Sequence, residues 1–525
     1  MKRNRITAIL ILSIISSLNV IAQKYHSDNG DGTYTNPVIA ADFPDPDVIL
    51  VNDTYYMVTT TMFVFPGVPI LKSHDLVNWE YCSNAVSRFD FSNCYDLDTC
   101  NRYGHGQWAT SLKYHNGKFY LLFITLNEGG FMCTATNPEG PWKVTHLPKG
   151  FYDPGLFFDG DAGHSGGQGK IYVAQGYNKI SITEVDSNLV AIGPDSLVYT
   201  GDIRKGLEGT HVYKINGYYY LYCTYGGRDG IQVALRSKNI YGPYEQKVVI
   251  RDTTPGVNFG IHQGALIQTK TGEWWTMLFV DSGPFGRFPS LQPVTWIDDW
   301  PMVGVNGKAV ITSKKPNVGK IYPIKTLPTS DEFNNKILGM QWRWNHNPDS
   351  TNWSLTKRPG YLRLTTGKVI SNLREARNTL TQRAFTYYSD SIPAAGVTKI
   401  DVGKMKDGDI AGLAVFQDPY AYIAVKQMNG SRYIIMVNND KTIDSAAINQ
   451  STVYLRTIAS NSKAKASFEY SLDNKKFTPL GNQLSMRFNL SIFTGNKFCL
   501  FNYATKETGG YVDFDWFRMG PYKMN

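Results

Sequence analysis

The sequence of 525 residues has little of what marks a nucleic-acid-binding or a membrane-spanning protein. Only 18% of its residues are charged, and Lys and Arg form no run typical of a basic binding stripe. Beyond residue 20, no apolar stretch is long enough to cross a bilayer as a helix. The sequence therefore predicts no nucleic-acid partner and, once an N-terminal signal has been cleaved, no insertion into a membrane.

The N-terminus has the features of a secretory signal. Three basic residues precede an apolar stretch over residues 6–20, and Ala22 is a small residue suitable for cleavage. A transmembrane anchor is the alternative, but the stretch is short and contains Ser and Asn side chains. We therefore expect a signal peptide over residues 1–22 and a secreted or periplasmic protein.

Cysteine is scarce for an exported chain, with six residues, and no spacing among them suggests a zinc site. Three share one loop region, where one local disulfide could form: Cys82, Cys94 and Cys100. The other three lie in strand-like runs and are expected to be buried: Cys133, Cys223 and Cys499.

Glycine and aromatic residues are plentiful, and one pattern that contains them recurs five times. Each copy has an anchor residue, an apolar run, a hairpin turn and an aromatic strand, with Asn-Gly turns at 116–117 and 216–217. The anchors are Asp45, Trp108, Asp153, Glu208 and the pair His262-Gln263. Amphipathic helices are missing between the copies, which argues against a βα barrel. Five units of about one blade each predict a five-bladed β-propeller.

Equivalent positions of a repeat occupy equivalent positions in space, so the five anchors should ring one mouth of the central channel. Three of them are carboxylates: Asp45, Asp153 and Glu208. Like charges in a confined site repel and raise each other's pKa, so such a cluster favours a catalytic role. Glycoside hydrolysis needs an ionised carboxylate to activate water and a protonated carboxyl to protonate the leaving oxygen. The alternative is that each carboxylate only ties loops together.

The repeat fades after Val280, and the rest of the chain has a different pattern. Three prolines between residues 316 and 328 mark a linker. From Asp331 onward, short strands with alternating apolar and polar residues follow one another between turns. We therefore expect an all-β protein with a propeller over residues 23–325 and a two-sheet β-sandwich over residues 326–525.

Several motifs resemble those of glycoside hydrolase family 43 across nearly the whole mature chain. They are Phe43-Pro-Asp-Pro-Asp-Val, Trp108-Ala, Tyr152-Asp-Pro, Leu207-Glu-Gly-Thr-His and Asp513-Phe-Asp-Trp-Phe-Arg. The resemblance implies a five-bladed propeller, a concanavalin-like jelly-roll sandwich and an inverting mechanism without a metal. It implies that Asp45 is the general base, Glu208 the general acid and Asp153 the residue that orients the acid and modulates its pKa. Inversion would place base and acid about 6.5–9.5 Å apart.

The resemblance also implies residues that contact the substrate. Arg287 matches a substrate-contacting arginine, and His262 matches an axial histidine that holds ordered water or an ion below the sugar. Trp108 is expected to form a wall of the subsite for the terminal sugar, because aromatic faces suit sugar C–H surfaces. Phe63 and Phe65 are expected to line the pocket. The alternatives are a surface cation for the arginine, a core histidine, and core packing for the tryptophan.

The function that the resemblance implies is exo-acting removal of terminal pentose from plant hemicellulose or pectic side chains. An α-L-arabinofuranosidase is favoured over a β-xylosidase, because Met62 stands where two-domain xylosidases of the family have Phe and because of the insertion at 103–108. Dual activity stays open. A non-catalytic propeller lectin is disfavoured, because the five anchors differ chemically. A fructan-cleaving propeller is disfavoured by Glu208-Gly and Tyr152-Asp-Pro, where that class usually has Glu-Cys and Arg-Asp-Pro.

The role of the sandwich follows from the same resemblance. In two-domain members it packs on the propeller and narrows the site to a pocket, and residues 491–498 are the candidate contact. An independent carbohydrate-binding module is the alternative. No cofactor is expected to be required. A structural calcium or other ion could bind at Asp331, Asp513 and Asp515, although ordinary strand-end aspartates are the alternative.

Overall fold

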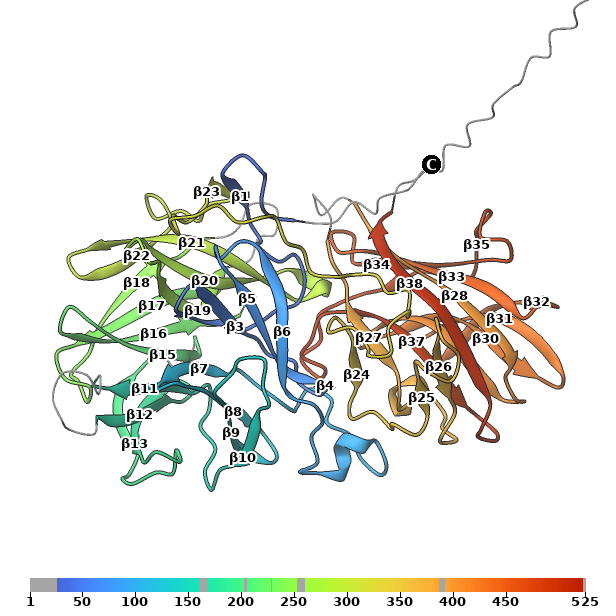
Figure 1. Ribbon diagram of the computed structural model, residues 1–525, viewed down its shortest axis with the longest axis horizontal. Helices are drawn as coiled ribbons and strands as arrows, with labels where there is room; N and C mark the ends of the chain where they lie inside the picture. Colours follow the sequence, from blue (N-terminus) through green and yellow to red (C-terminus); the bar gives the residue numbers. More distant parts are fainter. Residues whose placement is uncertain are drawn as a thin grey trace, which may run out of the picture.

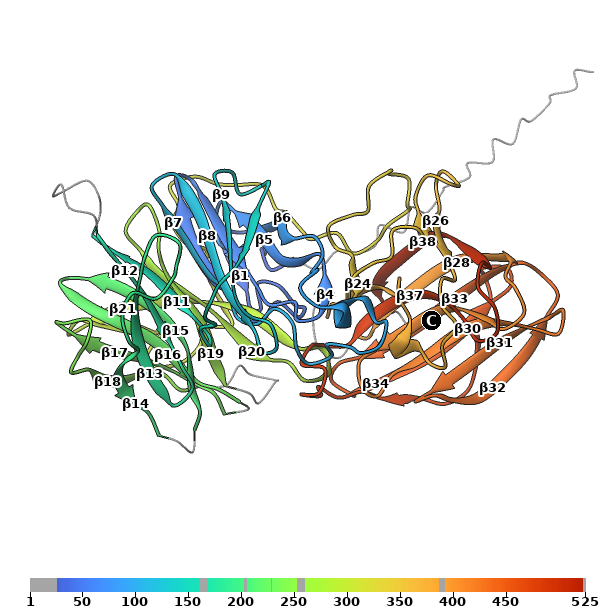
Figure 2. The same ribbon diagram turned by 90° about the horizontal axis from the view of Figure 1, so that it is seen from below.

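The computed structural model describes residues 26–160, 169–202, 205–227, 229–252, 260–386 and 392–522, and the expected signal peptide, residues 1–22, lies outside them. Figure 1 and Figure 2 show two all-β bodies side by side, one coloured blue to yellow-green and the other mainly orange and red. Among the described residues, no helix is both long enough and apolar enough to cross a membrane.

Five four-stranded antiparallel sheets form the first body, and the chain completes each sheet in turn. The first contains β2 (Asp47–Val51), β3 (Thr54–Val58), β5 (Gly67–Ser73) and β6 (Trp79–Val86). The second contains β7 (Ser111–His115), β8 (Lys118–Thr125), β9 (Gly129–Ala135) and β10 (Lys143–His146). The third contains β11 (Gly155–Asp159), β12 (Lys170–Gln175), β13 (Lys179–Val185) and β14 (Ser196–Thr200).

The last two sheets follow the same order. The fourth contains β15 (Leu207–Ile215), β16 (Tyr218–Tyr225), β17 (Ile231–Ser237) and β18 (Glu245–Ile250). The fifth contains β19 (Ile261–Gln268), β20 (Trp274–Asp281), β21 (Arg287–Ile297) and β22 (Trp300–Val303). Strand β1 (Thr33–Thr35) pairs separately with β23 (Thr312–Lys314).

The first strands of the five sheets form a closed ring. In chain order β2, β7, β11, β15 and β19 each contact the next, and β19 contacts β2 again. The blades pack face to face, so a middle strand such as β16 is buried on both faces, with Leu221, Tyr222 and Cys223 inaccessible to solvent. This closure confirms the five-bladed propeller that the repeat predicts.

A buried carboxylate ties three of the inner strands together. Asp47 begins β2, and its Oδ2 accepts a hydrogen bond of 2.7 Å from the backbone N–H of Leu112 in β7. Its Oδ1 lies 3.3 Å from Nδ1 of His211 in β15, and Lys113 Nζ lies 3.6 Å from Oδ2. Burial by itself would raise the pKa of Asp47, but the charges of Lys113 and His211 and the hydrogen bond from Leu112 together lower it to about 2.

The second body is a sandwich of two sheets, as predicted. The first sheet has the order β32 (Lys441–Ile448), β31 (Ser431–Asn438), β30 (Ala421–Met428), β29 (Asp409–Phe416), β37 (Lys497–Ala504), β27 (Leu380–Arg383), β24 (Arg343–Asn345) and β4 (Val64–Phe65). The second has the order β25 (Trp353–Ser354), β26 (Leu362–Thr365), β38 (Tyr511–Pro521), β28 (Ala394–Lys404), β33 (Thr452–Ser460), β34 (Lys465–Ser471) and β35 (Thr478–Pro479), with β36 (Leu484–Ser485) also on β34.

The two bodies are continuous rather than merely adjacent. Strand β4 belongs to the first blade's segment of the chain, yet it pairs with β24 of the sandwich through Phe65 and Trp344. One apolar cluster also crosses the boundary, with Phe43 and Phe285 on the propeller side and Trp342 on the sandwich side. The sandwich is therefore a docked part of one molecule, with a shared core.

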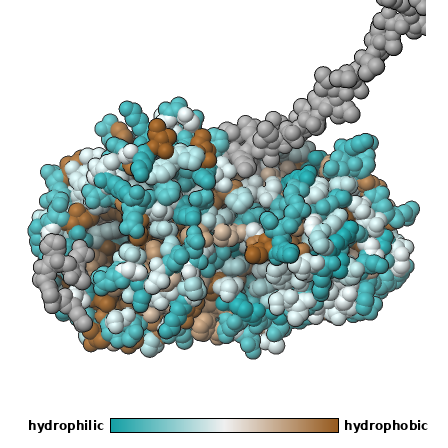
Figure 3. Space-filling model, in the orientation of Figure 1, coloured by the Kyte–Doolittle hydropathy of each residue, from teal (hydrophilic) through white to brown (hydrophobic). Residues whose placement is uncertain are grey.

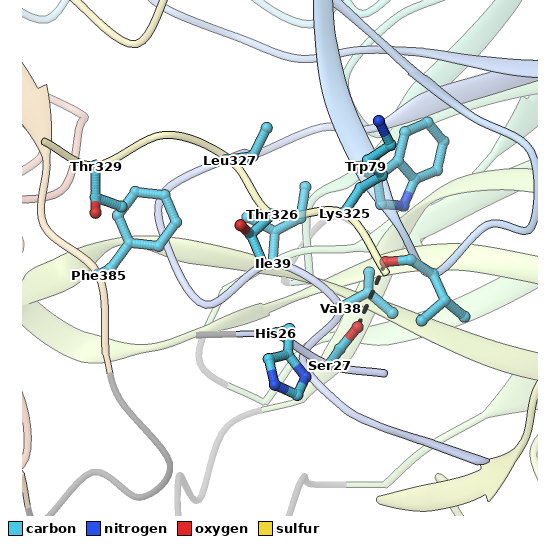
Figure 4. Close-up of a pocket in the computed structure, with 11 residues that line it drawn as sticks. His26, Ser27, Val38, Ile39, Trp79, Lys325, Thr326, Leu327, Thr329 and Phe385 are labelled. Atoms are coloured by element: carbon cyan, nitrogen blue, oxygen red, sulfur yellow. Dashed lines mark hydrogen bonds between the residues drawn. The ribbon is translucent and has the colours of Figure 1, made fainter. Parts of the chain in front are cut away.

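A small pocket lies where the N-terminal segment, the linker and the sandwich meet (Figure 4). Its lining includes His26, Trp79, Lys325 and Phe385, and none of the three anchor carboxylates contributes to it. Ser27 Oγ in this pocket donates a hydrogen bond of 3.4 Å to the backbone carbonyl of Val77. The pocket therefore lies at the junction of the N-terminal segment, the linker and the sandwich, and it is separate from the ring of anchors.

The cysteines follow the expectation in part, because a local disulfide forms but Cys82 lies in strand β6 and not in a loop. Cys94 and Cys100 form this disulfide, just before the insertion at 103–108. The four remaining cysteines are free and buried: Cys82, Cys133, Cys223 and Cys499.

Candidate active site

The three anchor carboxylates lie together at the inner strands of the first, third and fourth blades. Asp45 and Asp153 each stand two residues before an inner strand, β2 and β11, and Glu208 lies within β15. Asp45 is 7% and Asp153 6% exposed. The charges of Glu208 and Asp45 raise the pKa of Asp153, and the charge of Asp45 raises the pKa of Glu208, so the three carboxyl groups lie within electrostatic range of one another.

The backbone adopts the left-handed conformation at or beside four of the five anchors. The φ values are 53° at Asp45, 45° at Asp153 and 50° at Gln263, and in the fourth blade the neighbouring Gly209 has a φ of 65°. Non-glycine residues rarely adopt this region, and such strain concentrates at functional sites. The repeat therefore places one special backbone geometry at three of its five anchors and next to a fourth.

Two donors hold the carboxylate of Asp45. Arg287 Nη1 donates to its Oδ1 at 2.8 Å, and Thr60 Oγ1 donates to its Oδ2 at 2.6 Å. Both bonds are buried, and Arg287 itself is 7% exposed. Each oxygen of Asp45 therefore accepts a hydrogen bond from a different side chain, as the acceptor role of a carboxylate requires.

Glu208 and Asp153 occupy the opposite kind of environment. Burial raises the pKa of Glu208, and the charge of Asp45 raises it further against the hydrogen bond from Tyr152. Burial also raises the pKa of Asp153 well above its ordinary value, with the charges of Glu208 and Asp45 adding to it. Tyr152 OH donates to Glu208 Oε2 at 3.1 Å. Burial and like charge therefore favour the protonated form within this pair.

A glycine makes room for the Glu208 carboxyl. A Cβ added at Gly226 would lie 2.9 Å from Glu208 Oε1, closer than side-chain atoms can pack. The backbone that directly follows β16 therefore approaches the Glu208 carboxyl without a side chain in the way.

An aromatic wall from the sandwich reaches the site. Phe493 packs against Trp108 with ring centroids 4.9 Å apart, and the Arg287 guanidinium carbon lies 5.1 Å from the Phe493 ring centroid. The expected contact of residues 491–498 with the propeller is therefore present. It involves Trp108 and Arg287, which are both predicted to bind the substrate. Trp108 is partly buried, and its Nε1 has no hydrogen-bond partner among the described residues.

His262 lies in β19 and is 2% exposed. Its Nε2 is 3.5 Å from Asp281 Oδ2, and its ring packs against Phe279 with centroids 4.5 Å apart. Neither ring nitrogen has a hydrogen-bond partner within the described part of the protein. That buried, unsatisfied ring fits the expected water or ion, although the described residues contain no cluster of three or more His, Cys, Asp or Glu that could hold a metal.

The two phenylalanines predicted to line the pocket differ in position. Phe63 belongs to the cluster that includes Met62, Trp108 and Phe493, although it is only 1% exposed. Phe65 lies in a separate core cluster of the first two blades, stacked on Phe89 with centroids 5.9 Å apart. The expectation for Phe65 is therefore corrected: pairing in β4 turns its ring away from the pocket cluster and into the core.

The aspartates considered for calcium bind protein groups instead. Asp513 accepts bonds from Arg363 Nε at 2.7 Å and Arg358 Nη1 at 3.1 Å, and Asp515 pairs with Lys399 Nζ at 2.6 Å. Asp331 accepts a bond from Trp342 Nε1 at 2.8 Å. Arginine and lysine already balance two of these carboxylates, so the strand-end alternative fits them better than an ion site.

Sequence reasoning missed Thr60 and Tyr152, which contact the predicted residues directly. It predicted the loop over residues 491–498 as a contact but did not single out Phe493, whose ring packs on Trp108. Tyr152 belongs to the Tyr152-Asp-Pro motif. Its position next to Asp153 could therefore have identified it as a site residue from the sequence. Thr60 and Phe493 lie in loops whose side chains only the folded structure directs to the anchors.

Comparison with known proteins agrees with this geometry. The model of Glycosyl hydrolases family 43 matches residues 34–301, and that of the Beta xylosidase C-terminal Concanavalin A-like domain matches residues 330–520. A Beta-xylosidase of Formosa agariphila is 35% identical, over 95% of this chain and 92% of its own. The Non-reducing end alpha-L-arabinofuranosidase BoGH43B of Bacteroides ovatus is 31% identical, over 85% of this chain and 84% of its own.

Solved structures agree as well. A bifunctional GH43-CE protein of Bacteroides eggerthii has a TM-score of 0.84 and 39% identity, covering 93% of this chain. The present chain spans 64% of that longer protein. With its catalytic propeller and its concanavalin-like sandwich, the chain belongs to glycoside hydrolase family 43.

Proposed function

We propose that the protein is an inverting exo-glycosidase that removes a single terminal pentose from plant oligosaccharides or polysaccharides. The observation that carries the proposal is the contrast between the carboxylates. Asp45 is held by Arg287 and Thr60, whereas burial and like charge raise the pKa values of Glu208 and Asp153. One group suited to accept a proton therefore lies near one suited to donate a proton.

The reaction follows from these two states. Asp45 accepts a proton from water as the water oxygen bonds to the anomeric carbon. The bond from that carbon to the glycosidic oxygen breaks, and Glu208 gives its proton to the departing oxygen. Tyr152 and Asp153 hold Glu208 in place, and the anomeric configuration inverts because water attacks from the face opposite the leaving group.

The choice of sugar rests on two different observations. The Formosa agariphila relative, matched along nearly its whole length, is named a β-xylosidase, which favours terminal β-D-xylose as the first substrate to test. Met62, 1% exposed in the cluster that also holds Trp108 and Phe493, supports α-L-arabinofuranose as the second candidate. The Bacteroides ovatus relative carries an arabinofuranosidase name.

Exo action and location complete the proposal. Phe493 brings the sandwich against Trp108 and Arg287, so one side of the site is walled by the second domain, which suits a chain end or a side branch. The N-terminal sequence supports export, and we propose that the enzyme acts in the periplasm or outside the cell.

The test is hydrolysis of 4-nitrophenyl β-D-xyloside and 4-nitrophenyl α-L-arabinofuranoside by the full chain, by Glu208→Ala and by Asp45→Asn. We expect turnover of at least one substrate, with kcat falling about a thousandfold or more in Asp45→Asn. Glu208→Ala should lose more activity on xylobiose than on the nitrophenyl sugar, because nitrophenolate leaves with little protonation.

The stereochemistry is checked on the same material by ¹H NMR of the first product. An inverting enzyme releases the α-anomer of xylose from a β-xyloside before mutarotation. A β-anomer as first product would contradict the assigned mechanism. Turnover of neither sugar by the folded full chain would contradict the pentosidase proposal.

A further inference from the structure

Asp42 is a buried carboxylate, 5% exposed, three residues before Asp45. Its Oδ1 accepts a hydrogen bond of 2.9 Å from the backbone N–H of Arg287, and its Oδ2 accepts one of 2.8 Å from the backbone N–H of Gly495. Its backbone carbonyl accepts a bond of 2.6 Å from Arg383 Nε. One residue thus joins the first blade, the fifth blade and the sandwich.

Both amides bound by Asp42 belong to segments that carry side chains of the site. Arg287 donates its guanidinium to Asp45, and Gly495 lies two residues after Phe493. The Phe493 ring in turn contacts Arg287 and Trp108. A shift of either amide would therefore move a group that walls the pocket or binds the carboxylate of Asp45.

The sandwich loop is pressed closely onto the segment before Arg287. A Cβ added at Gly495 would lie 2.1 Å from the backbone oxygen of Phe285. Next to it, the backbone N–H of Asn496 donates to the Pro284 carbonyl at 2.8 Å, and Asn496 Nδ2 donates to the same oxygen at 2.7 Å. These contacts fix the sandwich loop relative to the segment that leads to Arg287, and Asp42 binds the backbone of both.

We propose that Asp42 is a positioning residue that sets the geometry of the pocket by fixing Arg287 and the Phe493 loop against Asp45. A carboxylate is required, because each oxygen accepts from a different N–H and neither position can hold a donor. An Asn in its place would turn an NH₂ group toward one of the two amides. The effect on catalysis rests on the proposed function, whereas the bond pattern itself does not.

The test compares Asp42→Asn and Gly495→Ala with Asp96→Asn in the full chain. Asp96 is a matched control, because it also bonds a sandwich side chain, Arg377 Nη2 at 3.1 Å, but contacts no site residue in the described structure. We expect Asp42→Asn and Gly495→Ala to raise KM and lower kcat/KM about ten- to a hundredfold, because misplacement by about 1 Å has that effect. Asp96→Asn should stay within about twofold.

A merely structural role would give a different result. Loss of folded protein lowers the apparent kcat at constant KM, so an unchanged KM in both Asp42→Asn and Gly495→Ala would overturn the proposal. Gly495→Ala leaves the carboxylate in place and keeps the test decisive if Asp42→Asn fails to fold.

Hydrogen exchange separates this inference from the proposed function. Without any substrate, Asp42→Asn should speed exchange at the amides of Arg287 and Gly495 at least tenfold, and Asp96→Asn should not. If the full chain cleaves no pentoside but exchange rises at these amides, the coupling stands and only the proposed function fails. Unchanged exchange at both amides would overturn the inference.

Discussion

At the scale of single residues, the site depends on carboxylates of the same chemistry in different surroundings. Arg287 and Thr60 both donate to Asp45, whereas Glu208 receives one bond from a tyrosine and is otherwise buried. Burial raises the pKa of Asp153, and the charges of Glu208 and Asp45 raise it further, so Asp153 and Glu208 disfavour each other's ionisation. Their apparent pKa values therefore belong to the pair.

Asp153→Asn should move the alkaline limb of the pH–activity profile to lower pH. Glu208 works protonated, so activity is lost as pH rises through its pKa. Removal of a like charge lowers that pKa, and the limb follows it. The measurement is kcat/KM against pH for the full chain and the variant. A limb that stays in place, with kcat reduced, would show that Asp153 orients Glu208 without raising its pKa.

Asp47→Asn should destabilise the propeller in a pH-dependent way. The pKa of Asp47 is lowered in the folded state, so its ionised form contributes stability above its ordinary pKa of about 4. That contribution is lost as pH falls toward about 2, the folded value. From the size of this shift we expect a pH-dependent loss of about 2 kcal/mol at pH 7.

Denaturant unfolding of the full chain and of Asp47→Asn at pH 7 and near pH 3 measures this difference. The gap between the two proteins should narrow at the lower pH, because the wild-type carboxylate begins to protonate. A gap that is constant with pH would mean that Asp47 contributes only by packing.

At the scale of elements, the short loop over residues 489–497 positions the Phe493 ring against Trp108. It begins with Asn489, whose Nδ2 donates to Asp418 Oδ2 at 2.6 Å, and ends at the start of β37. Between these fixed points Phe493 has a φ of 58°, a conformation that costs free energy for a bulky side chain. The surrounding contacts hold that strained residue over Trp108.

Phe493→Ala should raise KM for a pentoside about tenfold while kcat falls less. The change removes apolar wall area without touching the carboxylates. The control is Phe477→Ala, which removes a sandwich phenylalanine that packs on Arg456 instead. Steady-state kinetics on the nitrophenyl sugars measure both variants, and equal KM values for Phe493→Ala and the full chain would contradict a wall role.

At the scale of the whole molecule, the two domains share a core. Figure 3 shows a mainly hydrophilic surface over both bodies in this view, with few brown patches. The apolar contacts of Phe43 and Phe285 with sandwich residues are buried in the intact protein. A chain ending near residue 329 would expose that surface and leave β4 without its partner β24.

We therefore expect the isolated propeller to be poorly soluble and inactive, although it holds all three carboxylates. Soluble yield and turnover of the truncated chain, compared with the full chain, test this expectation. A soluble, fully active propeller would show that the sandwich contributes neither Phe493 nor the Asp42 contact to catalysis.

The sequence by itself determined the propeller and the set of anchors. The reason is physical: five copies of one hairpin pattern must fill equivalent positions, so Asp45, Asp153 and Glu208 had to meet at one ring. Alternation of apolar and polar residues likewise indicated the sandwich. These are local and periodic properties, which a chain shows without being folded.

Only the tertiary structure decided what surrounds those anchors. Long-range contacts bring Arg287 to Asp45 and Gly495 to Asp42, and no local pattern encodes them. The same limit explains Phe65, which sequence proximity to Phe63 placed in the pocket and strand pairing placed in the core. Composition and spacing fix which groups are available, whereas packing between distant segments fixes which of them face the substrate.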